Sequence, residues 1–164
     1  FEGEHRSPAE FDDVGNVAVV NACSKAYSMT GWRLGWVTGA TDRIERMLRV
    51  HQYAQACASA PAQYAAEAAL LGPQEPVAEM RAAFEERRDI LIDGFDEMGL
   101  ECPTPKGAFY AMPNVPDGWV DEVIERGVVV VPGEAFGESG AGYTDTETLH
   151  EAIDIMAEAT AALE

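Results

Sequence analysis

The chain opens with two short apolar runs. Residues 14–21, VGNVAVVN, are β-branched and apolar on both faces, a pattern that predicts a buried strand. A polar turn over residues 22–25 follows this run. Residues 31–39, GWRLGWVTG, predict a second strand, whose glycines at each end and inside allow a bulge or a close backbone approach. We therefore expect a pair of strands near the start of the chain.

Helical spacing begins after the second run. Residues 41–42 predict an N-cap for a helix that continues to Ser59. Its apolar positions fall near helical spacing at Ile44, Met47, Leu48 and Tyr53. Pro61, at a first-turn position, opens another helix, and the Gly-Pro pair at 72–73 closes it.

The longest helical pattern runs from Val77 to Met98, directly after Pro76. Its apolar stripe consists of Met80, Phe84, Ile90, Leu91 and Phe95. Gly94 lies inside the pattern, where a glycine costs about 1 kcal/mol relative to alanine. We place the boundary between two parts of the chain within this helix, around residues 76–99.

The sequence pattern changes after Gly99, in the last third of the chain. A link rich in proline and glycine over 103–107 comes first. The elements predicted after it are a strand over 108–112, a helix over 120–126, a strand over 128–131, a loop over 138–142 and a helix over 146–163. The final helix is amphipathic, with Leu149, Ile153 and Met156 facing inward. These elements predict a small α+β unit.

Composition adds a strong charge imbalance to this picture. The 164 residues are 47% hydrophobic, which excludes wholesale disorder, and their number matches one ordinary domain. Against 11 basic residues stand 29 acidic ones, for a net charge of −18, which disfavours nucleic acid and anionic membrane surfaces as partners. The acids form no long block and are expected to spread over the folded surface. Such a surface suits concentrated salt, and a halophile's protein is our hypothesis.

Cysteine and histidine spacing predicts no metal site. The three cysteines lack CxxC spacing and the three histidines lack HxxxH spacing, so we expect reduced thiols and no bound metal. No apolar run approaches the roughly 18 residues of a membrane span, and no signal segment opens the chain. We expect a soluble, cytoplasmic protein.

Lys25 and Arg33 are the candidate chemical residues. Lys25 is one of only two lysines, and it follows a predicted buried strand among hydroxyl-bearing neighbours. Partial desolvation there would favour the neutral amine that Schiff-base chemistry needs; an ordinary surface lysine is the alternative. Arg33 lies between Trp32 and Leu34 in an apolar run, where its planar fork would suit a phosphate or carboxylate. The alternative for Arg33 is an ordinary ion pair with one of the many acids.

The string from Ser24 to Gly35, SKAYSMTGWRLG, closely resembles the lysine motif of the class I and II aminotransferases. These are fold-type I pyridoxal-phosphate enzymes. The resemblance implies that Lys25 forms a Schiff base with the cofactor and later moves the proton at the substrate Cα. It also implies that Arg33 binds the cofactor phosphate, with Ser24 as a further phosphate neighbour.

The resemblance extends over essentially the whole chain, through family-like segments at 61–71, 107–113 and 127–137. It implies an α/β fold made of the end of the large-domain sheet, long interdomain helices and a small α+β domain. Residues 1–75 would belong to the large cofactor-binding domain, and residues 76–164 to the interdomain helix and the small C-terminal domain. Tyr110 or Phe109 would approach the substrate, unless this segment is simply core. Family members usually act as homodimers.

Three departures from the family pattern lead us to expect an incomplete chain. Ala22 stands where the family usually has a phosphate-binding serine. After Tyr143, the strand that carries the family's carboxylate-binding arginine is missing. The family segment that holds the cofactor ring would precede Phe1.

Three functions follow as hypotheses. The first is a pyridoxal-phosphate aminotransferase that moves an amino group from an amino acid to a 2-oxo acid. The second is a catalytically silent fragment that acts only as a binding or dimerisation module. The third is a pyridoxal-phosphate lyase of the same fold.

Overall fold

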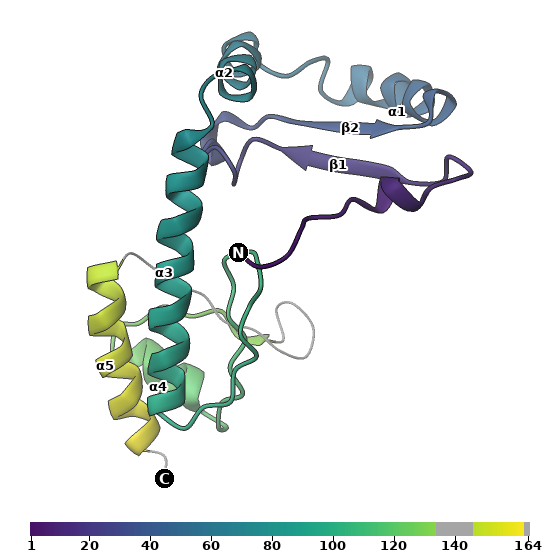
Figure 1. The fold of residues 1–164 in the computed structure, drawn as a ribbon. Coiled ribbons are helices and arrows are strands. Elements are labelled where there is room, and N and C mark those ends of the chain that lie inside the picture. Colours follow the sequence, from purple (N-terminus) through teal and green to yellow (C-terminus); the bar gives the residue numbers. More distant parts are fainter. Residues whose placement is uncertain (134–145, 163–164) are drawn as a thin grey trace. The chain divides into compact units, whose positions relative to one another are not determined.

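The structure, a computed structural model, describes residues 1–133 and 146–162, with side chains from residue 152 onward in the second range. The chain divides into two compact units (Figure 1). We call Glu4–Glu79 the sheet unit, and Phe1–Gly3 together with Met80–Glu164 the helical unit. The predicted loop at 138–142 lies outside the described residues.

The sheet unit contains an antiparallel pair of strands, β1 (Ala18–Ala22) and β2 (Gly35–Gly39), in a register that sets Ala22 opposite Gly35. Both strands begin later than the sequence predicts. The Asp12 carboxylate accepts hydrogen bonds from the Val17 and Asn16 amides, each 2.7 Å long, so the chain turns before β1. These bonds, that of Val17 first, hold the pKa of Asp12 below its usual value. Before β2, residues 30–32 form a 3-10 turn instead of strand.

The prediction that the first strand is buried is wrong. Val20 is 76% exposed, and no residue of β1 is fully buried. The physical reason is that the described sheet has only two strands, so few neighbours cover its faces. The buried part of this unit is instead a small cluster beyond the strand end, formed by Cys23, Met29 and Ala66.

Two helices complete the sheet unit. Helix α1 (Thr41–Ala54) has Ala40 at its N-cap, one residue before the predicted cap, and ends before Ser59. Its apolar stripe is largely solvent-exposed, since Leu48 is 57% exposed and Tyr53 is 88% exposed. Helix α2 (Ala60–Leu71) begins and ends as predicted, with a proline in its first turn and Gly72 at its C-cap.

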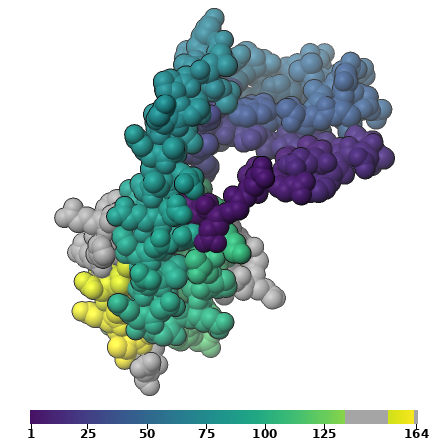
Figure 2. Space-filling view, in the orientation of Figure 1, coloured from purple at the N-terminus to yellow at the C-terminus, as the bar shows by residue number. Residues whose placement is uncertain are grey.

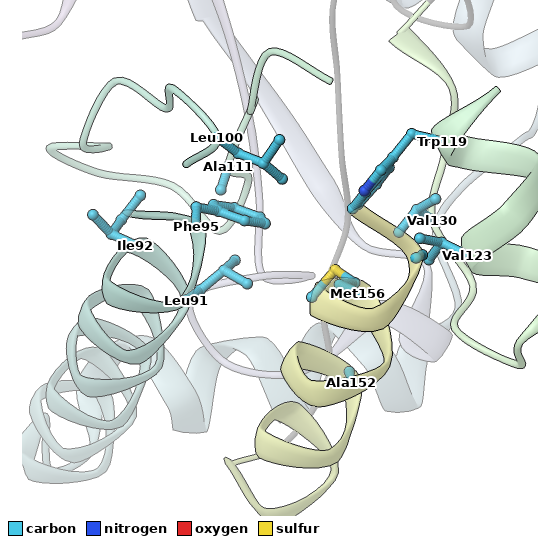
Figure 3. Packing of buried hydrophobic residues seen from close by; sticks show 11 residues of the cluster. Leu91, Ile92, Phe95, Leu100, Ala111, Trp119, Val123, Val130, Ala152 and Met156 are labelled. Carbon is cyan, nitrogen blue, oxygen red and sulfur yellow. The ribbon is translucent and has the colours of Figure 1, made fainter. Parts of the chain in front are cut away.

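Helix α3 (Glu75–Glu97) begins in the sheet unit and continues into the helical unit, where α4 (Trp119–Glu125) and α5 (Thr146–Ala162) complete the described helices. All three confirm the predicted elements. Their buried faces share one apolar core with the loops between them (Figure 3). Its members are Leu91, Ile92, Phe95, Leu100, Ala111, Trp119, Val123, Val130, Ala152, Met156 and Ala159.

A glycine lets two of these helices approach each other. A Cβ built on Gly94 of α3 would meet the Ile153 side chain of α5 at 2.9 Å, which explains a residue that is otherwise costly inside a helix. Figure 1 shows α5 running beside α3. Ile153 packs against the core and Met156 lies in it, as predicted, whereas the Leu149 side chain lies outside the described residues.

The strands predicted over 108–112 and 128–131 are absent; neither segment pairs in a ladder within residues 1–133 and 146–162. Their apolar residues contribute Ala111 and Val130 to the core all the same. A β-branched run specifies burial, but strand geometry also needs a partner whose backbone groups it can bond. In the described part of this unit, these two apolar segments therefore contribute to the core without pairing as strands.

Arg88 attaches the first residues to α3. Its side chain is only 11% exposed and forms ion pairs with Asp89 at 2.7 Å and Glu2 at 3.4 Å. The guanidinium also lies 5.0 Å from the centre of the Phe1 ring, a cation–π contact. Figure 2 shows the purple N-terminal residues against the teal helix. The ion pair with Glu2 and the cation–π contact with Phe1 thus attach Phe1–Gly3 to the helical unit.

Three expected absences concern the described residues only. No helix among them is both long enough and apolar enough to cross a membrane. They hold no cluster of histidine, cysteine and acidic side chains able to bind a metal. The three cysteines form no disulfide.

Phe95 tests the core of the helical unit. Its side chain is 2% exposed, so Phe95→Ala should lower the free energy of unfolding by about 3–5 kcal/mol. Leu71→Ala, at a position 81% exposed, should change it by less than about 0.5 kcal/mol. Urea denaturation of both variants measures the difference. Equal losses would contradict the core described here.

Candidate functional site

The candidate site is built on the connection between β1 and β2, residues 23–34, which we call the lysine loop. The Cys23 amide donates to the Leu34 carbonyl at 3.3 Å and closes the loop beside the Ala22–Gly35 pair. A Cβ on Gly35 would lie 2.6 Å from the Asn21 carbonyl oxygen, so only glycine permits this approach of the strands. The two ends of the loop are therefore held together by the sheet.

Hydrogen bonds inside the loop shape the segment that carries Lys25. The Thr30 hydroxyl donates to the Ser24 carbonyl at 3.0 Å, and the Ser28 amide donates to the Lys25 carbonyl at 3.2 Å. The Tyr27 amide donates to the Cys23 carbonyl at 3.3 Å. These bonds fold the residues around Lys25 into a turn.

Two buried side chains anchor the loop on α2. Cys23 is fully buried, Met29 is 8% exposed, and both belong with Ala66 of α2 to the small apolar cluster. Tyr27 and Leu34 pack against the same cluster. The loop therefore rests on a helix as well as on the sheet.

The Lys25 side chain is exposed and Ser24 is half-buried. The expectation of a partly desolvated Lys25 is therefore wrong for the described residues. The physical reason is that Lys25 follows a two-stranded sheet whose residues are themselves largely exposed. Lys25 does hold a fixed backbone position, through the bond that its carbonyl accepts.

Arg33 differs from its expected setting in two ways. It adopts a left-handed conformation, with φ of 53°, before β2 begins, and it is exposed where the sequence suggested burial in a strand. One guanidinium nitrogen, Nη1, donates to the Thr30 carbonyl at 2.8 Å. Arg33 also does not form the ordinary ion pair that was the alternative, since it has no carboxylate partner among the described residues.

Arg33 lines an open pocket of about 880 Å³. Its wall includes the hydroxyl-bearing residues Ser28 and Ser59, His51 at the end of α1, and the first turn of α2. This pocket combines hydroxyl groups, a helix N-terminus and an arginine that pairs with no carboxylate in the described part of the chain. Such a combination fits a phosphate group. Lys25 and Ser24 do not line this pocket.

The local sequence keeps this region free of negative charge. Residues 14–41 contain no aspartate or glutamate, although the chain has 29 acidic residues. Lys25 and Arg33 are the basic residues of that stretch. The absence of acidic residues from this stretch is a sequence signal for an anion site. The spacing of the motif residues does not contain this signal.

Tyr110 belongs to the helical unit, where its side chain is 46% exposed. Its ring lies 4.6 Å from that of Phe109, which in turn lies 6.4 Å from Phe84 of α3. Tyr110 is thus an exposed member of an aromatic group and not a core residue. Its approach to a substrate stays a prediction.

Sequence reasoning missed Gln74, the residue before α3. Its side-chain oxygen accepts a hydrogen bond of 3.1 Å from the Tyr27 hydroxyl, two residues after Lys25. No spacing rule connects positions so far apart in the chain. Only the fold brings Gln74 to the lysine loop.

Comparison with known proteins now gives the family. Residues 2–155 match the family described as aminotransferase class I and II. The chain belongs to this family. Its members depend on pyridoxal phosphate, so the resemblance of the lysine motif and the mixed α/β fold class are both confirmed. The roles of Lys25, Ser24, Arg33 and Tyr110 stay predictions.

The similar proteins are longer than this chain. An LL-diaminopimelate aminotransferase of Moorella thermoacetica is 41% identical over 82% of the chain and 37% of its own length. A probable aspartate aminotransferase of Methanocaldococcus jannaschii is 38% identical over 96% of the chain and 46% of its own length. The chain therefore spans less than half the length of these relatives.

Solved structures agree with the fold of this aminotransferase-family chain. Aspartate aminotransferase of Thermus thermophilus with maleate has a TM-score of 0.90 at 34% identity, over 97% of this chain and 45% of that one. An aromatic aminotransferase of Pyrococcus horikoshii has a TM-score of 0.90 at 33% identity, over 99% of this chain and 48% of that one.

Gly35 tests how the lysine loop is closed. Gly35→Ala should lower the free energy of unfolding by about 1–3 kcal/mol, because the added methyl group meets a backbone oxygen that cannot move aside. Gly31→Ala is the matched control, since a Cβ there would meet no atom within 4 Å. Thermal denaturation compares the two variants. A similar effect of both would contradict the close approach at Gly35.

Proposed function

We propose that this chain is part of a pyridoxal-phosphate aminotransferase that moves an amino group from an amino acid to a 2-oxo acid. The observation that carries the proposal is the lysine loop, which holds Lys25 and Arg33 on one hydrogen-bonded connection, with no carboxylate paired to Arg33 among the described residues. Family membership adds the cofactor class. Because the chain spans less than half of its relatives, the activity is proposed for the whole protein.

The same proposal assigns domains. Residues 1–75 are the C-terminal part of the large cofactor-binding domain, and residues 76–164 are the interdomain helix and the small domain. The division of the structure between Glu79 and Met80 lies close to this boundary and supports it, apart from Phe1–Gly3.

Each candidate residue has a distinct task. Bound pyridoxal phosphate supplies an electron sink for the charge that develops at the substrate Cα. The Lys25 amine holds the cofactor and moves the proton at that Cα. Arg33 binds the phosphate, with Ser24 nearby, while Ala22 offers a methyl group where the family has a hydroxyl. Tyr110 approaches the amino acid or 2-oxo acid.

A second candidate function rests on a different observation. The sheet unit exposes several large apolar side chains, among them Tyr53 at 88%, Leu71 at 81% and Val20 at 76%. Apolar side chains that gather in a contiguous exposed patch mark interaction sites. A binding or dimerisation module without catalysis is therefore the alternative for this chain.

Lysine trapping tests the proposed function. The chain is incubated with pyridoxal phosphate, reduced with borohydride and mapped by mass spectrometry. We expect label on Lys25 because its position in the loop is fixed, and loss of that label in Lys25→Ala. The chain has only one other lysine, exposed Lys106, so Lys106→Ala is the matched control and should keep the label. Equal labelling of both lysines would overturn the proposal and favour the binding module.

The phosphate contact is measured in the same assay. Arg33→Lys keeps the charge but loses the planar fork, so the cofactor concentration for half-maximal labelling should rise about tenfold or more. Arg49→Lys, at an exposed position of α1, is the control and should leave that concentration unchanged. An unchanged concentration in Arg33→Lys would remove Arg33 from the site.

We further propose a cytoplasmic homodimer adapted to high salt. The acidic side chains that give the net charge of −18 repel one another in the folded chain. Salt screens this repulsion, because it shortens the Debye length to about 3 Å at 1 M. The melting temperature should therefore be higher in multimolar KCl than in dilute buffer. Scanning calorimetry over a KCl series measures this, and greatest stability in dilute buffer would contradict the adaptation.

A further inference from the structure

We propose that Gln74 is a positioning residue that, together with Tyr27, holds the lysine loop against the end of α2. The role of this pair in cofactor binding rests on the proposed function. The part that it plays in ordering the loop does not.

Both the nitrogen and the oxygen of the Gln74 side-chain amide form hydrogen bonds. Nε2 donates to the carbonyls of Ala69 and Gly72, at 2.9 Å each. Carbonyl oxygens can only accept, so the NH₂ group must face them and Oε1 must face Tyr27. The Tyr27 hydroxyl is then the donor of the 3.1 Å bond to Oε1. The network fixes the orientation of the amide.

Pro73 explains why α2 needs this side chain. The Ala69 carbonyl would normally accept from the amide four residues later, but that residue is Pro73, which has no N–H. The Nε2 group of Gln74 supplies the missing donor. The backbone carbonyl of Gln74 meanwhile accepts from the amides of Val77 and Ala78 and begins α3. Gln74 is thus fixed by both helices before it contacts the loop.

The contact with Tyr27 gives the lysine loop an anchor on the far side of Lys25. Cys23, two residues before Lys25, is fully buried, and Tyr27, two residues after it, is bound to Gln74. The Tyr27 amide also bonds the Cys23 carbonyl across the turn. The attachment point of Lys25 therefore lies between two fixed residues. Such fixation reduces the ordering that cofactor binding would otherwise require.

The hydrogen bond of Gln74 to Tyr27 and its hydrogen bonds to the end of α2 can be tested separately. Tyr27→Phe removes only the bond toward the loop and leaves the bonds to α2 in place. Gln74→Met removes all three with little change in volume. Tyr64→Phe and Gln52→Met are matched controls, because both residues are exposed and neither belongs to the apolar cluster that anchors the lysine loop on α2.

The experiment uses the 164-residue chain in two measurements. Amide hydrogen exchange, followed by NMR without cofactor, reports the Tyr27 and Ser28 amides, both of which donate within the loop. The pyridoxal-phosphate concentration for half-maximal borohydride trapping reports cofactor binding. In Tyr27→Phe we expect faster exchange at both amides and a half-maximal concentration raised about 3- to 10-fold, the equivalent of one hydrogen bond. In the double variant Tyr27→Phe/Gln74→Met, the Tyr27 and Ser28 amides should exchange no faster than in Gln74→Met alone. Both amides should exchange in the controls as they do in the parent chain.

Unchanged exchange at Tyr27 and Ser28 in Tyr27→Phe would overturn the proposal, because the bond would then not order the loop. Faster exchange with an unchanged half-maximal concentration would overturn the positioning role and leave a structural one. If the parent chain is not labelled on Lys25, the proposed function fails, while the exchange data still decide whether the pair orders the loop. Should Gln74→Met fail to fold, Tyr27→Phe carries the test alone.

Discussion

The hydrogen bond from the Cys23 amide to the Leu34 carbonyl is the constraint on which the site depends. It continues the β1–β2 ladder by one step and forces the chain between its two ends into a closed loop. A longer, open connection would let Lys25 and Arg33 separate, whereas this closure keeps both on one short segment. The requirement for glycine at position 35 follows from the same closure, because the strands meet too closely there for a side chain.

Burial is divided unevenly between the two units, and this affects how the loop is held. The helical unit has a continuous apolar core, while the buried cluster at the lysine loop comprises, among the described residues, only Cys23, Met29 and Ala66. A two-stranded sheet is marginally stable by itself. The loop must therefore rely on directional contacts, such as Thr30 to Ser24 and Tyr27 to Gln74, more than on apolar packing.

The sequence predicts helices here better than strands, for a physical reason. Helix α2 satisfies most of its backbone groups internally, so Pro61 and Gly72 mark its ends without knowledge of the fold. A strand depends on a partner elsewhere, and the valine run at 128–131 contributes to the core without pairing in the described chain. In the same way, the lysine motif points to Lys25 and Arg33 as candidate site residues. No local pattern points to Gln74, because its partner Tyr27 is 47 residues away.

The distribution of charge explains how an acidic chain can keep an arginine available for an anion. Arg6, Arg46 and Arg126 each have an acid four residues away on the same helix or turn and form an ion pair with it. Arg33 has Met29 and Val37 at the corresponding positions, within a stretch that lacks acids from residue 14 to residue 41. The local sequence therefore gives Arg33 no acid at the positions that pair with these three arginines. Because the surrounding surface is strongly negative, a phosphate held there must be bound by short-range contacts with the guanidinium and nearby N–H groups, and not attracted by the field of the whole protein.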